Sequence, residues 1–290
     1  MTKTSVLISK DKNIAPTLLS KKEKLIYLAN SVLDDARFFA EFKNILYNLK
    51  LTRPEVIDSF LEYNLNIYSN DGNKVYNSLA NRVVLHIHNL LAGSWHIDRQ
   101  KTIQKLIKKA NPRHVADIGF GVPSQYVKNM VIRENRFKLT LCDLYDSAFV
   151  FAETLLNIWD DNWLGKIGFL KTDMDNHDFV GKFDLYIFQD SIEHTHYPAV
   201  YLHKYVKLSD NNARFLFSLP IGPIIPRHFI AWETVDEAMD WLDKCGLIVE
   251  AHEQVFVNPD IDLFAEQLGE DYCNLIILCA KKYTASRGDS

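Results

Sequence analysis

Several features that would mark a specialised environment are scarce or absent in this sequence. It has 4 cysteines, and no two of them have the Cys-x-x-Cys spacing of zinc sites and redox motifs. No stretch approaches the roughly 20 apolar residues of a membrane-spanning helix. The formal net charge of -4 gives no basic excess for binding nucleic acid or an anionic membrane. We therefore expect neither nucleic acid nor a membrane as a partner.

The remaining composition is that of an ordinary globular protein. The hydrophobic fraction is 47% and the charged fraction is 24%. A chain of 290 residues predicts one large domain, or one with a smaller partner domain. The apolar run Val6-Leu7-Ile8 is far too short for the hydrophobic region of a signal peptide. Each cysteine lies in an apolar stretch, so we expect reduced, buried thiols in a cytoplasmic protein; they are Cys142, Cys245, Cys273 and Cys279.

Apolar residues recur at helical spacing from about residue 20 to residue 110. Two capping boxes, Ser20 with Glu23 and Thr52 with Glu55, predict helix starts. We predict an all-helical N-terminal cap over residues 1–110, which covers the substrate or contacts a second copy in a homodimer. Its aromatic residues are candidates for the lining of a pocket or for the core; they are Tyr63, Tyr68, Tyr76 and Trp95.

Beyond Pro112, short apolar strands alternate with helical segments, which predicts a parallel α/β sheet. Thr234 with Glu237 caps one of these helices, and Gly246 lies where that helix should end. We expect an α/β fold with a Rossmann-like, seven-stranded, mostly parallel sheet over residues 111–282, and a frayed tail over 283–290. The strands are predicted near residues 114–118, 139–142, 167–170, 183–188, 213–219, 247–252 and 273–280.

The most informative segment, residues 115–121, is a predicted buried strand that ends in a glycine turn. Gly119 permits the tight bend, and Gly121 lets a ligand approach the main chain. A helix beginning near Ser124 would point its first N–H groups at that ligand. A turn that uses glycine for geometry alone is the alternative. Acidic residues at the ends of successive strands favour a nucleotide site, and Asp143, about 20 residues past the turn, is placed for a ribose.

The segment Asp117-Ile118-Gly119-Phe120-Gly121 resembles the first motif of class I S-adenosylmethionine-dependent methyltransferases of the small-molecule type. The likeness extends over about residues 105–282. It implies that the glycine turn contacts the methionine portion and ribose of S-adenosylmethionine, and that Asp143 holds the ribose hydroxyls. Asp173 would bind the adenine amino group, and Met174 would supply an apolar face. The implied cofactor-binding residues are Asp117, Gly119, Gly121, Asp143, Leu144, Asp173, Met174, Gln189 and Asp190.

Residues 183–194 resemble the fourth motif of the same family, and they end in a Glu193-His194 pair. In small-molecule members this pair lies beside the reactive methyl group. Histidine titrates near neutral pH, so our candidates for a catalytic base are His194 and then His228, with a structural role as the alternative. No metal is expected; an alternative set for a divalent ion is His194, His196, His228 and Asp190.

The leading hypothesis is an S-adenosylmethionine-dependent methyltransferase that acts on a small biosynthetic metabolite and releases S-adenosylhomocysteine. Val122-Pro123 departs from the first motif, which favours as an alternative the transfer or cyclisation of the cofactor's aminocarboxypropyl group, with release of methylthioadenosine. A non-catalytic binding protein of the same fold is a further alternative. A nicotinamide-dependent dehydrogenase is disfavoured, because Ser124 replaces the third glycine of that fingerprint and Asp117 stands two residues before Gly119.

Overall fold

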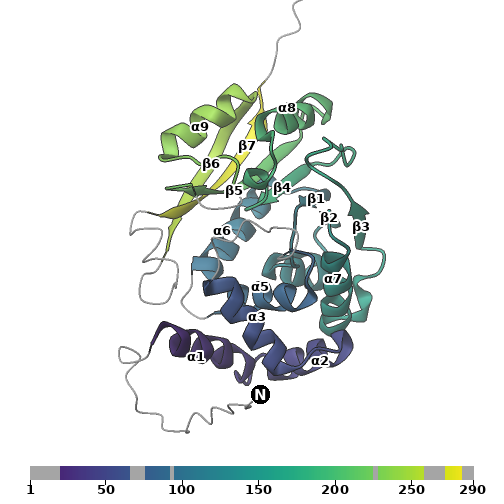
Figure 1. The fold of residues 1–290 in the computed structure, drawn as a ribbon. Coiled ribbons are helices and arrows are strands. Elements are labelled where there is room, and N and C mark those ends of the chain that lie inside the picture. Colours follow the sequence, from purple (N-terminus) through teal and green to yellow (C-terminus); the bar gives the residue numbers. More distant parts are fainter. Residues whose placement is uncertain (1–19, 66–75, 92–94, 225–227, 258–271, 283–290) are drawn as a thin grey trace, which may run out of the picture.

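The computed structural model describes residues 20–65, 76–91, 95–224, 228–257 and 272–282 (Figure 1). Tyr68, the segment Val6-Leu7-Ile8 and the predicted tail 283–290 lie outside these residues. No helix in the described part of the chain combines the length and the apolar character needed to cross a membrane.

The helices of the described N-terminal residues 20–65 and 76–91 form a cap below the sheet in Figure 1. Both predicted capping boxes are present: Ser20 and Glu23 exchange hydrogen bonds at the start of the first helix, and Thr52 and Glu55 do so at the third. The buried faces of these helices share one core, which also takes in Phe151 of a later helix. The cap helices are α1 (Lys21–Leu33), α2 (Phe39–Leu49), α3 (Arg53–Leu65) and α5 (Leu79–Leu90).

The sheet has seven strands in the order β3-β2-β1-β4-β5-β7-β6. The pairs that join β3, β2, β1, β4 and β5 are all parallel, whereas β7 is antiparallel to both β5 and β6. The predicted α/β fold with a seven-stranded, mostly parallel sheet is confirmed. The strands are β1 (His114–Ile118), β2 (Lys138–Asp143), β3 (Ile167–Lys171), β4 (Leu185–Gln189), β5 (Arg214–Ile221), β6 (Leu247–Phe256) and β7 (Cys273–Lys281).

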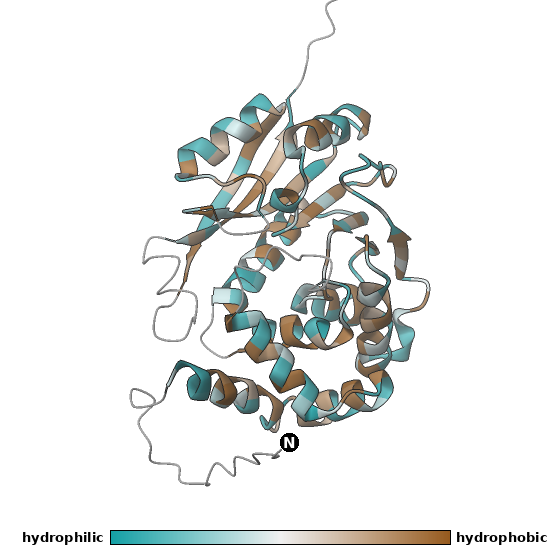
Figure 2. Cartoon of the chain, in the orientation of Figure 1, coloured by the Kyte–Doolittle hydropathy of each residue, from teal (hydrophilic) through white to brown (hydrophobic). Residues whose placement is uncertain are grey.

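Two hydrophobic cores flank this sheet, because alternate residues of a strand point to opposite faces. On β4, Leu185 and Ile187 enter one core, and Tyr186 and Phe188 enter the other. Figure 2 shows brown, hydrophobic segments along the strands, with teal, hydrophilic segments between them. The first core includes α6 (Trp95–Ala110), η2 (Val127–Arg133) and α7 (Asp146–Trp159), and the second includes α8 (Pro198–Leu208) and α9 (Val235–Lys244).

Three details qualify the sequence-based expectations. Helix α6, counted above with the N-terminal region, packs on the sheet through Ile103 and Ile107. The helix expected after the glycine turn is present, but most of it has π-helical hydrogen bonding. Two short 3-10 helices, η3 (Asp161–Trp163) and η4 (Ile192–His194), lie in connections. All 4 cysteines are buried and unpaired, as expected.

Candidate functional site

A cavity of about 640 Å³ opens where the carboxyl ends of β1, β2 and β4 face the helical cap. Strand order reverses between β1 and β4, which is where parallel α/β sheets bind their ligands. The predicted catalytic histidines His194 and His228 both line this cavity. So do all of the predicted cofactor-binding residues except Asp117, namely Gly119, Gly121, Asp143, Leu144, Asp173, Met174, Gln189 and Asp190.

The glycine turn forms a cradle that side chains would fill. Gly119 has φ +69 and Gly121 has φ +62, in the left-handed region that favours glycine. A Cβ atom added at Gly119 would lie 2.7 Å from Cβ of Ser191 and 3.6 Å from Cε of Met174. The first glycine is therefore required by close packing as well as by backbone conformation.

Asp117 lies behind the turn and does not line the cavity. Its Oδ2 accepts hydrogen bonds from the Tyr126 hydroxyl at 2.6 Å and from Nε2 of Gln189 at 3.0 Å. Burial raises the pKa of Asp117 to about 7. Asp117 is therefore a buried residue whose hydrogen bonds stabilise the region behind the glycine turn. Its predicted contact with a cofactor stays a prediction.

Asp143 is buried at the end of β2 and is bound by the glycine turn. Its carboxylate accepts hydrogen bonds from the backbone N–H of Gly121 at 3.1 Å and of Tyr145 at 2.9 Å. Burial raises the pKa of Asp143, and the guanidinium of Arg82 opposes that shift. The carboxylate thus stands at the cavity wall, next to the cradle, where the resemblance places the ribose.

Arg82 of α5 is a site residue that the sequence analysis missed. Its side chain is almost fully buried; Nη1 donates to the carbonyl of Gly121 at 2.9 Å, and Nε donates to Oγ of Ser147 at 3.2 Å. Its Nη2 lies 3.7 Å from Oδ1 of Asp143 and makes no hydrogen bond within the described residues. An arginine on the buried face of an apolar helix was the available sign, because such a charge needs a partner.

Two residues of α6, Arg99 and Gln100, make a second link between the helices and the sheet. Arg99 forms an ion pair with Asp190, which also accepts a hydrogen bond from Oγ of Ser218 at 2.7 Å. Nε2 of Gln100 donates to Oε1 of Gln189 at 3.1 Å. The two predicted residues at the end of β4 are therefore held by side chains that the sequence pattern did not identify.

After β3, Asp173 lines the cavity and accepts hydrogen bonds from the backbone N–H of Asp175 and from Nδ2 of Asn176, each at 2.9 Å. These contacts fold the segment after β3 into a local turn. Met174 lies beside the glycine cradle, as the close approach of its Cε to Gly119 shows. An apolar face is thus present, while recognition of adenine by Asp173 stays a prediction.

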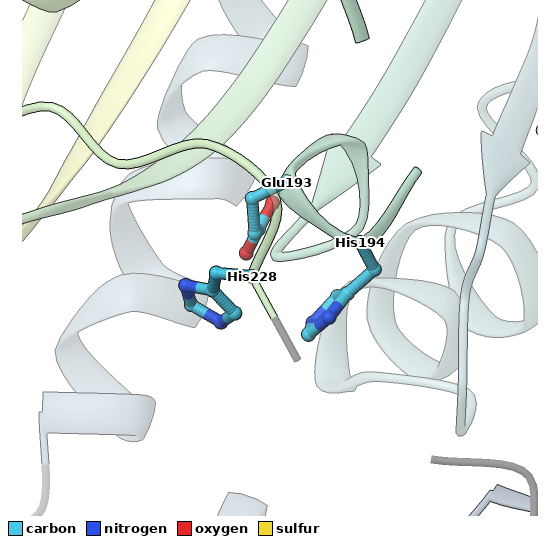
Figure 3. Close-up of side chains that lie close together, drawn as sticks. All are labelled: Glu193, His194 and His228. Carbon is cyan, nitrogen blue, oxygen red and sulfur yellow. The ribbon is translucent and has the colours of Figure 1, made fainter. Parts of the chain in front are cut away.

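Glu193, His194 and His228 come together beside the cavity (Figure 3). One ligand atom from each side chain lies within 4.8 Å of the others. The two imidazole rings meet edge to face, with centroids 4.7 Å apart. Glu193 is completely buried, and burial raises its pKa to about 8. The backbone N–H of Phe229 donates to the carbonyl of Glu193 at 2.8 Å, which fixes the loop of His228 against η4.

The alternative metal set of the sequence analysis is not assembled. Nδ1 of His196 lies 2.8 Å from Oδ2 of Asp175, and its ring packs on Phe229 with centroids 3.9 Å apart. Asp190 is paired with Arg99. His196 separates from His194 because η4 ends at His194, so the next residues turn away.

The cap end of the cavity is lined by rings. Tyr63, Tyr76 and Trp95 line it, as predicted, together with His88 and His96. Trp95 and His96 stack with centroids 4.0 Å apart. Burial lowers the pKa of His88 to about 4 and that of His96 well below its ordinary value, so both imidazoles are uncharged at neutral pH. This end therefore offers aromatic surface without a histidine charge.

No family model and no curated protein matches this sequence. Solved structures do resemble it. The N-methyltransferase NodS from Bradyrhizobium japonicum, in complex with S-adenosylhomocysteine, is 15% identical, with a TM-score of 0.54 over 73% of this chain and 99% of that one. An O-methyltransferase family protein from Burkholderia thailandensis is 11% identical, with a TM-score of 0.52 over 79% of this chain and 72% of that one.

The [4+2]-cyclase SpnF is also similar, at 11% identity and a TM-score of 0.51 over 66% of this chain and 83% of that one. The strand order of this chain and the glycine turn at the end of β1 are consistent with the fold of these structures. The chain therefore has the fold of class I S-adenosylmethionine-dependent methyltransferases.

Proposed function

We propose that this protein is an S-adenosylmethionine-dependent methyltransferase that acts on a small molecule. The observation that carries the proposal is the joint placement of the glycine cradle and Asp143. Gly121 has a positive φ and donates its N–H to the Asp143 carboxylate at the point where strand order reverses. An ordinary strand-to-helix turn does not need a buried carboxylate at this place, because burying one without compensation is costly.

The cavity fits the cofactor in its chemistry. The cradle has no side chain at Gly119 or Gly121, Asp143 is an acceptor for ribose hydroxyls, and Met174 and Leu144 are apolar surfaces for a base. The likeness to NodS, whose structure contains S-adenosylhomocysteine, supports the same assignment. Sites for small molecules typically have volumes of about 300 to 1,000 Å³, a range that includes this cavity.

When bound, S-adenosylmethionine supplies an electrophilic methyl group, whose bond to sulfur breaks with the electron pair leaving on sulfur. The protein's task is then to align an acceptor and to take its proton. His194 is the first candidate for that base and His228 the second, because both line the cavity. Aromatic rings from the helical region line the cavity, which favours a small substrate over a polymer. A homodimer through the cap stays a prediction.

Calorimetric titration with S-adenosylmethionine tests the proposal directly. Asp143→Asn should weaken binding by about tenfold or more, because hydrogen bonds to a charged acceptor contribute about 1.5 to 3 kcal/mol. Asp146→Asn is the matched control, since Asp146 is an exposed acid three residues away that pairs with Lys171. Absence of binding by the unmodified protein would reject the proposal, and equal affinities of the two variants would reject the role of Asp143.

The nucleoside product separates methyl transfer from the aminocarboxypropyl alternative. The departure that suggested this alternative is Val122-Pro123, and Val122 both packs in the core of the helical cap and lines the cavity. If the protein transfers a methyl group, mass spectrometry of a reaction with a metabolite extract should show S-adenosylhomocysteine. Methylthioadenosine would instead support the alternative, and cofactor binding without either product would support a non-catalytic binding protein.

A further inference from the structure

We propose that Glu193, His194 and His228 form a binding site for a divalent transition-metal ion. Three atoms of ligand type, one from each side chain, lie within 4.8 Å of one another. In Figure 3, the carboxylate of Glu193 and the imidazole rings of His194 and His228 lie around a common space. Glu193 and His194 come from η4, and His228 comes from the connection between β5 and α9.

The Glu193 carboxylate lacks the partners that a buried acid needs. The side chain is completely inaccessible, and neither oxygen has a hydrogen-bond partner within the described residues, although its own backbone N–H lies close. A buried carboxylate in this state is costly, and such charges in proteins are paired or coordinate metals. A cation between Glu193 and the two imidazoles would supply the missing partner.

The neighbouring charges leave room for a cation. Arg99 acts electrostatically on Glu193 and also forms an ion pair with Asp190. Arg99 thus supplies one positive charge for two carboxyl groups. The cluster therefore has an excess of one negative charge when Glu193 is ionised.

The donor set selects the class of ion. Two imidazole nitrogens and one carboxylate oxygen suit Zn²⁺, Fe²⁺, Co²⁺ or Ni²⁺, whereas Mg²⁺ and Ca²⁺ prefer oxygen ligands. Three protein ligands would leave a coordination position toward the cavity, as in catalytic zinc sites. The site is held in place beforehand, because the Phe229 N–H binds the Glu193 carbonyl at 2.8 Å.

The role of this ion rests on the proposed function, although the site itself does not. With His194 and His228 bound to the ion, neither imidazole would be available as the base proposed above. A small acceptor bearing a hydroxyl or carboxylate would instead use the open position, because a bound cation lowers the pKa of a coordinated hydroxyl. A metal ion at this site would therefore favour substrates that bear a hydroxyl or carboxylate group.

The test uses the full-length, tag-free, chelator-treated protein without S-adenosylmethionine. Titration with Co²⁺, followed by visible absorption, should show one ion per chain, and Zn²⁺ should displace it while Mg²⁺ does not. Glu193→Gln, His194→Ala and His228→Ala should each weaken Co²⁺ binding by more than about 100-fold, beyond the 10- to 100-fold effect of losing a supporting residue. His196→Ala, which alters a neighbouring histidine paired with Asp175, should leave binding unchanged.

No stoichiometric binding, or full binding by all three ligand variants, would overturn the proposal. X-ray absorption of the Zn²⁺-loaded unmodified protein provides a measurement that does not depend on the folding of variants; it should show two imidazole ligands, and their absence would also overturn it. A failed metal test with intact S-adenosylmethionine binding rejects only the metal site. Metal binding by a protein that does not bind S-adenosylmethionine rejects only the proposed function.

Discussion

The two walls of the cavity carry opposite charges. The sheet wall, at the ends of β2 and β4, presents the carboxylates of Asp143 and Asp190 and the carboxyl group of Glu193, whose pKa burial raises to about 8. The helical wall, made by α5 and α6, presents the guanidinium groups of Arg82 and Arg99. Each arginine is buried and lies next to one carboxylate, Arg82 at Asp143 and Arg99 at Asp190. Either wall alone would hold buried charges without partners.

This difference shows that the helical region is a part of the site. A buried ion pair contributes little net stability over an apolar pair, but the loss of one partner is strongly destabilising. Arg82 also donates to the Gly121 carbonyl, so the cap directly holds the glycine cradle. Neither oxygen of Glu193 has a hydrogen-bond partner within the described residues, which sets it apart from the other carboxyl groups of the sheet wall. The largest changes in the free energy of unfolding should therefore come from substitutions of buried carboxyl groups that have no arginine partner on the helical wall.

Asp117 has such a carboxyl group, and it should make stability depend strongly on pH. Burial raises its folded-state pKa from an ordinary value of 3.8 to about 7. Between pH 4 and pH 7 the unfolded chain has lost this proton while the folded protein keeps it, so stability falls as the pH rises through that range. At 1.36 kcal/mol for each pKa unit, the fall amounts to about 4 kcal/mol.

Asp117→Asn should remove the part of the fall that Asp117 causes and make the protein more stable than the unmodified form at pH 8, while the part caused by Glu193, whose pKa burial raises to about 8, stays. Urea unfolding at pH 4.5 and pH 8 measures the effect. Asp58→Asn, which changes an exposed residue of α3, is the control and should keep the original profile. Parallel profiles for the Asp117 variant and the unmodified protein would show that this carboxyl is not the titrating group.

Arg82→Met should have the next largest effect, because it removes the helical partner of the sheet wall. We expect a loss of about 3 kcal/mol in the free energy of unfolding, since the buried Asp143 charge loses its cation. Arg53→Met is the matched control: Arg53 pairs with Asp34 near the surface, and such pairs contribute at most about 1 kcal/mol.

A double-mutant cycle with Asp143→Asn isolates the contact between the walls. The combined variant should lose less stability than the sum of the single variants, with a coupling of about 1 kcal/mol. Strict additivity, measured by urea unfolding, would mean that Arg82 acts through its bonds to Gly121 and Ser147 and not through Asp143.

The sheet wall could be predicted from the sequence because its residues follow strands. Each parallel strand ends at the same edge, so Gly119, Asp143 and Asp190 must meet there once the strands are placed correctly. The predicted seven strands follow from short-range alternation and turn residues in the same way. The alternation of apolar residues, together with the rule that ligands bind at the carboxyl ends of parallel strands, was sufficient to predict the strands and the residues at their ends.

The helical wall could not be predicted, because its pairs join residues that are distant in the chain. Gly121 and Arg82 are 39 residues apart, and Gln189 and Gln100 are 89 apart. Nothing local in α5 or α6 specifies such a partner. The sequence also could not show which histidines lie together. The 3-10 helix η4 ends at His194, whose ring lies beside that of His228, whereas His196 contacts Asp175.

The glycine cradle offers the smallest and most specific test of the sheet wall. Gly119 and Gly165 both have a positive φ, +69 and +80, so alanine at either position carries a similar backbone strain. Only at Gly119 does an added Cβ meet a neighbour, at 2.7 Å from Cβ of Ser191, whereas nothing lies within 4 Å at Gly165. Gly119→Ala should therefore be less stable than Gly165→Ala by about 2 kcal/mol, the usual cost of overpacking.

Removing the neighbour should recover most of that difference. Ser191→Gly combined with Gly119→Ala clears the contact while keeping the backbone strain, so its melting temperature should approach that of Gly165→Ala after correction for Ser191→Gly alone. The same double variant should still bind S-adenosylmethionine less tightly than the unmodified protein, because the new methyl group stands in the cradle. Recovery of stability together with full affinity would show that the space over Gly119 is needed for packing alone, and the cofactor would then have to be held by Gly121 and Asp143 without the first glycine.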